Sequence, residues 1–164
     1  MESNHDDLGT IKTLFDLQIA SKDYSGAKQT AESMKSALKD NPLGYYLSGV
    51  LLQNEDNNLA AEKEFLTALD KQPRANEPLS GLVRLYLSEG KYDKAINMLK
   101  DITKDDPDYL VPYNLLGEVG ITVKDYNLAA DSFNSAIKIN DKWWIPYRGL
   151  SLVHAAQGNK EKSI

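Results

Sequence analysis

The sequence predicts an all-α fold, a solenoid of antiparallel helix hairpins with about 4.5 repeats. Small residues recur with a period of 34 residues, at Ala27, Ala61, Ala95, Ala129 and Ser163. Within each period, apolar residues follow the three- and four-residue spacing of amphipathic helices, and nothing reads as a strand. A period of this size marks one supersecondary unit that must bury its apolar face against its neighbours.

Polar breaks and prolines divide the chain into helices. Asp23, Asn57 and Asp125 are residue types that favour the N-cap position, and they are spaced by one and two periods. Each precedes the second helix of a hairpin. Pro78 and Pro112 fit the first turn of the first helix of a hairpin, where the missing N–H costs no hydrogen bond. The predicted helices are 8–21, 24–40, 43–54, 58–71, 77–88, 92–105, 111–122, 126–139, 144–157 and a stub from 160.

The same register predicts the domain organisation. Residues 1–7 are expected to be disordered, and residues 8–164 to form a single solenoid. Its units are 8–41, 42–75, 76–109, 110–143 and a truncated 144–164. The second helix of the first unit should be about one turn longer than the others, because Tyr24 is farther from Pro42 than Asn58 is from Pro73.

Composition limits the classes of partner. The formal net charge is -5 with acidic and basic residues mixed along the chain, so no basic stripe is available for nucleic acid. No apolar stretch approaches the length of a membrane span, which is about 20 residues. There is no cysteine, so both the cytoplasm and the periplasm remain open as compartments.

The residues that carry most enzyme chemistry are sparse. His5 and His154 are the only histidines, and no spacing typical of a metal site or a general base surrounds them. No glycine-rich phosphate-binding motif occurs either. We therefore expect no catalytic residue, no cofactor and no metal, and the chain is predicted not to be an enzyme.

One family has this pattern. Tyr113, Leu116 and Gly117, followed by Tyr126, Ala129, Phe133 and Ala136, resemble the tetratricopeptide repeat, and the resemblance covers residues 42–164. The repeat departs from the family pattern at Ser48, Val83 and Asp141. The resemblance implies a right-handed solenoid of bacterial type that binds protein or peptide on its concave side.

The first helix of each hairpin lines that concave groove in the family, which implies a set of binding residues here. Apolar members of this set on a solvent-facing stripe would need cover from a ligand. Two adjacent tryptophans, Trp143 and Trp144, cannot both point inward, so one is expected in the core and one partly exposed as a further binding contact. The implied groove residues are Tyr46, Val50, Gln53, Arg84, Leu87, Asn114, Glu118, Ile121, Arg148 and Leu152.

Three functional hypotheses remain open at this point. The first is a scaffold that binds a peptide during assembly of a secretion, pilus or polysaccharide-export complex. The second is a targeting or regulatory domain excised from a larger enzyme. The third is self-association, a homo-oligomer formed through the truncated C-terminal end.

Overall fold

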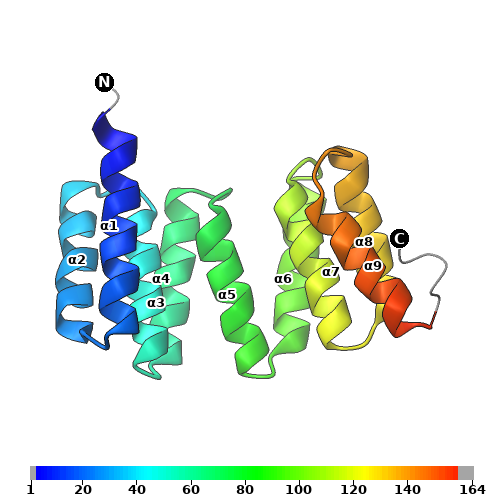
Figure 1. Cartoon of the computed structure of the whole chain (residues 1–164), viewed down its shortest axis with the longest axis horizontal. Coiled ribbons are helices and arrows are strands. Elements are labelled where there is room, and N and C mark those ends of the chain that lie inside the picture. The colour runs from blue at the N-terminus through cyan, green and yellow to red at the C-terminus, as the bar shows by residue number, and fades with distance from the viewer. Residues whose placement is uncertain (1–2, 159–164) are drawn as a thin grey trace. The chain divides into compact units, whose positions relative to one another are not determined.

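The computed structural model describes residues 3–158, with side chains described from residue 8 onward. Within that range the chain forms nine α-helices and no strand, which confirms the predicted all-α helical repeat (Figure 1). The predicted stub from 160 lies outside the described residues. The helices are α1 (Ser3–Ala20), α2 (Tyr24–Ala37), α3 (Leu43–Asn54), α4 (Asn58–Lys71), α5 (Asn76–Ser88), α6 (Tyr92–Asp105), α7 (Leu110–Thr122), α8 (Tyr126–Ile139) and α9 (Ile145–Ala156).

Two expectations at the N-terminal end are wrong. The first helix begins at Ser3 and not at residue 8. The expected disorder of residues 1–7 stays a prediction. The predicted start rested on the apolar pattern that begins at Leu8, and a helix can begin before the first residue of such a pattern. The second helix is not longer than its counterparts, because α2, α4, α6 and α8 each contain 14 residues.

The error in α2 arises from Pro42. This proline is the N-cap residue of α3 and follows Asn41, whose side-chain oxygen accepts a hydrogen bond from the Leu43 N–H at 2.9 Å. Pro42 therefore begins the following helix, whereas Pro73 follows the end of α4. The extra residues lie in the segment 38–42 between α2 and α3.

The chain divides into two compact units, residues 1–85 and 86–164, with the boundary inside α5. The single solenoid over 8–164 stays a prediction. In the first unit, α1 contacts α2 and α3, α2 contacts α3, and α3 contacts α4. In this unit, α1, α2 and α3 together form a core that contains Phe15, Ala27, Ala31, Met34, Leu47 and Leu51.

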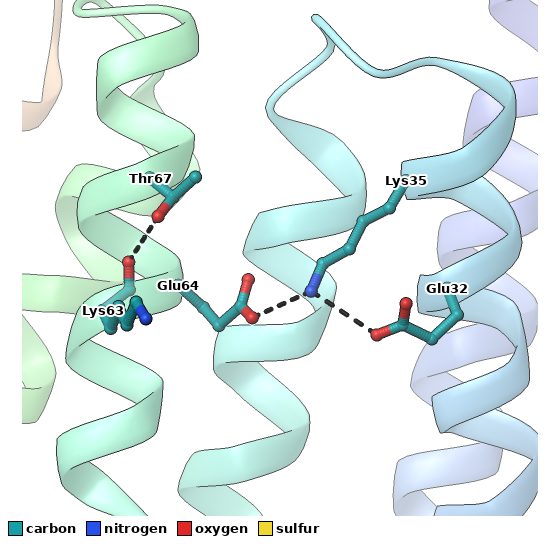
Figure 2. A network of polar contacts seen from close by, with 5 residues as sticks. All are labelled: Glu32, Lys35, Lys63, Glu64 and Thr67. Carbon is teal, nitrogen blue, oxygen red and sulfur yellow. Dashed lines mark hydrogen bonds and ion pairs between the residues drawn. The ribbon is translucent and has the colours of Figure 1, made fainter.

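Phe65 of α4 is a large, fully buried side chain deeper in this unit. It packs against two glycines, and a Cβ atom added at Gly49 would lie 2.6 Å from the ring and one at Gly81 2.9 Å from it. On the side facing α2, the Lys35 ammonium contacts a Glu64 oxygen at 2.9 Å and a Glu32 oxygen at 3.5 Å (Figure 2). These contacts connect α4 to the preceding hairpin.

The second unit repeats this packing around Phe133. In it, α7 contacts α6, α8 and α9, and α8 contacts α9. The Phe133 ring lies against Gly117 of α7 and Gly149 of α9, where added Cβ atoms would collide with it. A Cβ atom at Gly120 would lie 2.8 Å from the Ala129 backbone nitrogen, so α7 and α8 approach closely at Ala129, one of the recurring small residues.

The turns inside the hairpins also repeat. In each described hairpin, the last residue of the turn after the first helix has a positive φ angle. These residues are Lys22 (60°), Asp56 (58°), Gly90 (70°) and Lys124 (60°). The next residue caps the second helix in three of the four described hairpins, with Asp23, Asn57 and Asp125 accepting a backbone N–H. Lys91 makes no such side-chain bond.

Candidate functional site

Five of the ten predicted groove residues meet in one hollow of the second unit. Asn114, Glu118 and Ile121 follow the spacing of four and three residues that keeps them on one face of α7. Arg148 and Leu152 occupy the corresponding face of α9. The hollow has a volume of about 210 Å³, and its remaining lining residues are Phe133, Ile145 and Gly149.

Asn114 forms the polar floor of this hollow. Only 6% of the residue is exposed, and its Nδ2 donates a hydrogen bond to the Glu118 Oε1 at 2.8 Å. Its Oδ1 is buried and accepts no hydrogen bond from any residue that the structure describes. A buried carbonyl oxygen without a donor is costly, so an incoming N–H at this atom would be favourable.

The rim of the hollow is charged and apolar. The Arg148 side chain is exposed, and Leu152 is 52% exposed beside it. Ile121 is half-buried because it packs against the cluster of Ala129, Phe133 and Val153. An arginine next to an exposed leucine offers a carboxylate-binding fork and an apolar contact at the same opening.

The first unit has a separate hollow of about 420 Å³, formed where α1 and α3 meet the loops before α3 and α5. The Lys12 ammonium lies 3.3 Å from a Glu77 oxygen and 5.8 Å from the centre of the Tyr46 ring. Tyr46 is a predicted groove residue and lines this hollow. The lining residues that the groove prediction omitted include Leu8, Asn41, Arg74, Glu77 and Pro78.

The other predicted groove residues do not join either hollow. Val50 is half-buried and packs, like Tyr46, against the core of the first unit, so the chain itself covers part of its apolar surface. Gln53 and Leu87 are half-buried, and Arg84 is exposed. Their part in binding stays a prediction.

The tryptophan pair separates as expected in one respect. Trp144 is 64% exposed and is the N-cap residue of α9, next to Ile145 of the hollow. Trp143 is half-buried and not in the fully buried core, so the expectation of one core tryptophan is wrong. Helix α8 ends at Ile139, which places both indoles in the turn that connects it to α9.

Sites of two other kinds are absent from the described residues. In that part of the chain, no three or more histidine or acidic side chains are grouped so that they could hold a metal ion. Among the same residues, no helix combines the length and apolarity needed to cross a bilayer.

Comparisons with known proteins give a family match and a shared fold. A family model described as tetratricopeptide repeat matches residues 51–117. A thermophilic tetratricopeptide-repeat protein of Thermus thermophilus has a similar structure, with a TM-score of 0.67 and 17% identity, over 95% of this chain and 86% of that one. No curated protein sequence matches.

Two further solved structures share the fold. Pseudomonas aeruginosa pilF gives a TM-score of 0.67 at 15% identity, over 96% of this chain and 72% of that chain. MamA 41-end from Desulfovibrio magneticus RS-1 gives a TM-score of 0.59 at 14% identity, over 96% of this chain and 89% of that chain. At these identities the likeness concerns the fold.

Proposed function

We propose that this chain, in which residues 51–117 match the tetratricopeptide-repeat family, binds an extended peptide in the hollow between α7 and α9. Members of that family are generally non-enzymatic scaffolds for protein interaction. The observation that carries the proposal is the buried Asn114 Oδ1, which has no donor among the described residues. An extended peptide presents backbone N–H groups at regular intervals, and one of them would satisfy this atom.

The rim residues specify the side chains of that peptide. Arg148 would bind a carboxylate of the ligand, because the guanidinium group donates two parallel hydrogen bonds to a planar oxyanion. Leu152 and the exposed edge of Ile121 would cover an aliphatic side chain. The preferred ligand is therefore an extended segment with one acidic and one aliphatic residue close together.

The narrower part of the proposal is that the peptide belongs to a component of a secretion, pilus or polysaccharide-export complex. The shared fold with pilF is compatible with this role and does not select it. A peptide found by selection and then traced to an assembly protein would support the narrower role, and one traced to an unrelated protein would contradict it.

A selection from a library of displayed peptides, followed by calorimetry with the selected sequences, tests the site. Arg148→Glu should weaken binding by about tenfold or more, since a charge-assisted hydrogen bond contributes about 1.5–3 kcal/mol. Asn114→Ser removes the carbonyl acceptor and installs the residue that α5 has at the same position, Ser80. It should weaken the same peptides by a smaller factor.

Lys100→Glu provides the control. It makes the same change in net charge as Arg148→Glu, on an exposed position of α6 in the same unit. Peptides that bind the parent and this control equally, and lose affinity for the Arg148 variant, place recognition at the hollow. Equal loss with both variants would indicate a nonspecific charge effect and would contradict the proposal.

A further inference from the structure

The outer face of α4 carries two leucines in solvent. Leu59 is 82% exposed and Leu66 is 45% exposed. They lie seven residues apart, so both project from the same side of the helix. Glu62, Lys63, Thr67 and Asp70 complete a shallow depression around them.

The other second helices show that these leucines are not required by the fold. At the position of Leu59, α2, α6 and α8 have Ser25, Asp93 and Asn127, and all three are exposed. In the three remaining described hairpins, the repeat therefore places a polar residue at this position. An exposed leucine alone is ordinary, but two on one face of one helix call for a covering surface.

The position of Leu66 follows the same rule. Its counterparts are Glu32 of α2, Lys100 of α6 and Asn134 of α8, again all exposed. We propose that this face of α4, defined by Leu59, Glu62, Lys63 and Leu66, binds the same face of a second copy of the chain, with the two helices antiparallel.

Charge complementarity selects a second copy as the occupant. A two-fold axis midway between Glu62 and Lys63 places Leu59 opposite Leu66 of the second copy, and Leu66 opposite its Leu59. The same axis places Glu62 of each copy opposite Lys63 of the other. Each of the two pairs therefore joins a negative and a positive side chain. Such a self-complementary patch is what an isologous dimer contact requires.

The opposite side of α4 holds this face in position. Phe65 and Ala68 are buried in the first unit, and Glu64 contacts Lys35 of α2 at 2.9 Å (Figure 2). The Thr67 hydroxyl donates to the Lys63 carbonyl oxygen at 2.8 Å, which keeps this hydroxyl close to its own helix. The helix therefore presents the leucines without a rearrangement of the unit.

Sedimentation velocity of the full chain over about three decades of protein concentration measures the association. The parent should pass from monomer to dimer as concentration rises. The double variant Leu59→Ser, Leu66→Asn carries residues that α2 and α8 have at these positions, so its hairpin should fold as the parent does. Its dimer dissociation constant should rise at least tenfold.

Charge exchange identifies the partner as a second copy in the antiparallel register. Glu62→Lys alone would place two lysines opposite each other across the axis, and Lys63→Glu alone would place two glutamates there. Each single variant should associate at least about fivefold more weakly than the parent. A mixture of the two single variants restores opposite-charge pairing and should associate more tightly than either single variant alone.

Circular dichroism of each variant checks that the fold is retained. A parent that stays monomeric through the whole concentration range overturns the proposal. So does a dimer that the leucine variant leaves unchanged, since its interface would then lie elsewhere. If the mixed single variants associate no better than either alone, the contact is not the antiparallel pair of two α4 helices.

Discussion

Helices α6 and α8 have the same length and the same place in the repeat, but they differ in the size of the side chain that they bury at one equivalent position. Phe133 of α8 lies against Gly117 and Gly149, whereas Leu99 occupies the same position of α6. The positions equivalent to those two glycines, one period earlier, are Val83 and Leu115, and both are buried. In sequence, the large ring of α8 therefore goes with two glycines, whereas the smaller Leu99 of α6 goes with two larger residues.

The turns before these two helices differ in the same compensating way. Before α6, Gly90 adopts the left-handed conformation with a φ of 70°, and Lys91 gives no side-chain cap. Before α8, Lys124 takes a φ of 60°, and the Asp125 side chain accepts the Leu128 N–H at 3.0 Å. Each turn combines one favourable residue with one unfavourable residue.

The largest expected effect comes from removing the aromatic ring of α8. Phe133→Ala should lower the free energy of unfolding by about 3–5 kcal/mol, because the two adjoining glycines offer no side chain that could move into the cavity. Leu99→Ala should cost less, about 2–3 kcal/mol, because leucine is smaller than phenylalanine and its removal leaves a smaller cavity.

Urea unfolding followed by tryptophan fluorescence measures both variants. The chain has two tryptophans, Trp143 and Trp144, and both belong to the second unit with Leu99 and Phe133. A cost for Leu99→Ala equal to or above that for Phe133→Ala would contradict the idea that the glycines leave the ring without substitutes.

The next effect tests whether Phe133 and the two glycines beside it act as one packing unit. Gly117→Val introduces the residue found at Val83, and its Cβ atom would start 2.5 Å from the Phe133 ring. Overpacking should cost about 1–3 kcal/mol. Adding Phe133→Leu and Gly149→Leu reproduces the set Val83, Leu99 and Leu115, so the triple variant should recover most of that loss.

A mutant cycle over these three positions gives the coupling energy. Strong non-additivity is expected, because the three side chains share one space. If the separate costs simply add, the glycines at 117 and 149 are not there to accommodate the Phe133 ring.

The repeat explains why so much of the fold was predictable. The bounds of α4, α6 and α8 agree with the prediction. Local signals mark where α4 and α8 begin, namely the N-cap residues Asn57 and Asp125. Pro42 led to the wrong predicted length for α2, because a proline can either follow one helix or begin the next. No other repeat has a proline at the equivalent position that would distinguish the two cases.

The candidate site was predictable only in part. Asn114 and Glu118 are four residues apart on one helix, so their contact could be expected from spacing. The burial of the Asn114 Oδ1 could not, because it results from tertiary packing around the hollow between α7 and α9. The Lys12 and Glu77 contact joins segments far apart in the chain and carries no local signal. Leu59 and Leu66 depart in sequence from the polar residues at the equivalent positions of the other repeats, but only the structure shows that both leucines are exposed.

The smallest expected effect concerns the turn before α8. Lys124→Gly would place the residue of the α6 turn next to the existing Asp125 cap, so this turn would have both favourable features. A non-glycine residue in the left-handed conformation costs about 1–2 kcal/mol, and the greater freedom of glycine in the unfolded chain offsets part of the gain. We expect a stabilisation of about 0.5–1 kcal/mol in the same fluorescence-detected unfolding.

The matched change in the other turn is Lys91→Asp, which adds the missing cap beside Gly90. It should stabilise by about 1 kcal/mol or less, since the new carboxylate can accept a hydrogen bond from the first turn of α6. The reciprocal variant Gly90→Lys should destabilise by about the amount that Lys124→Gly gains. If Gly90→Lys and Lys124→Gly change stability in the same direction, backbone strain does not explain the difference between the two turns.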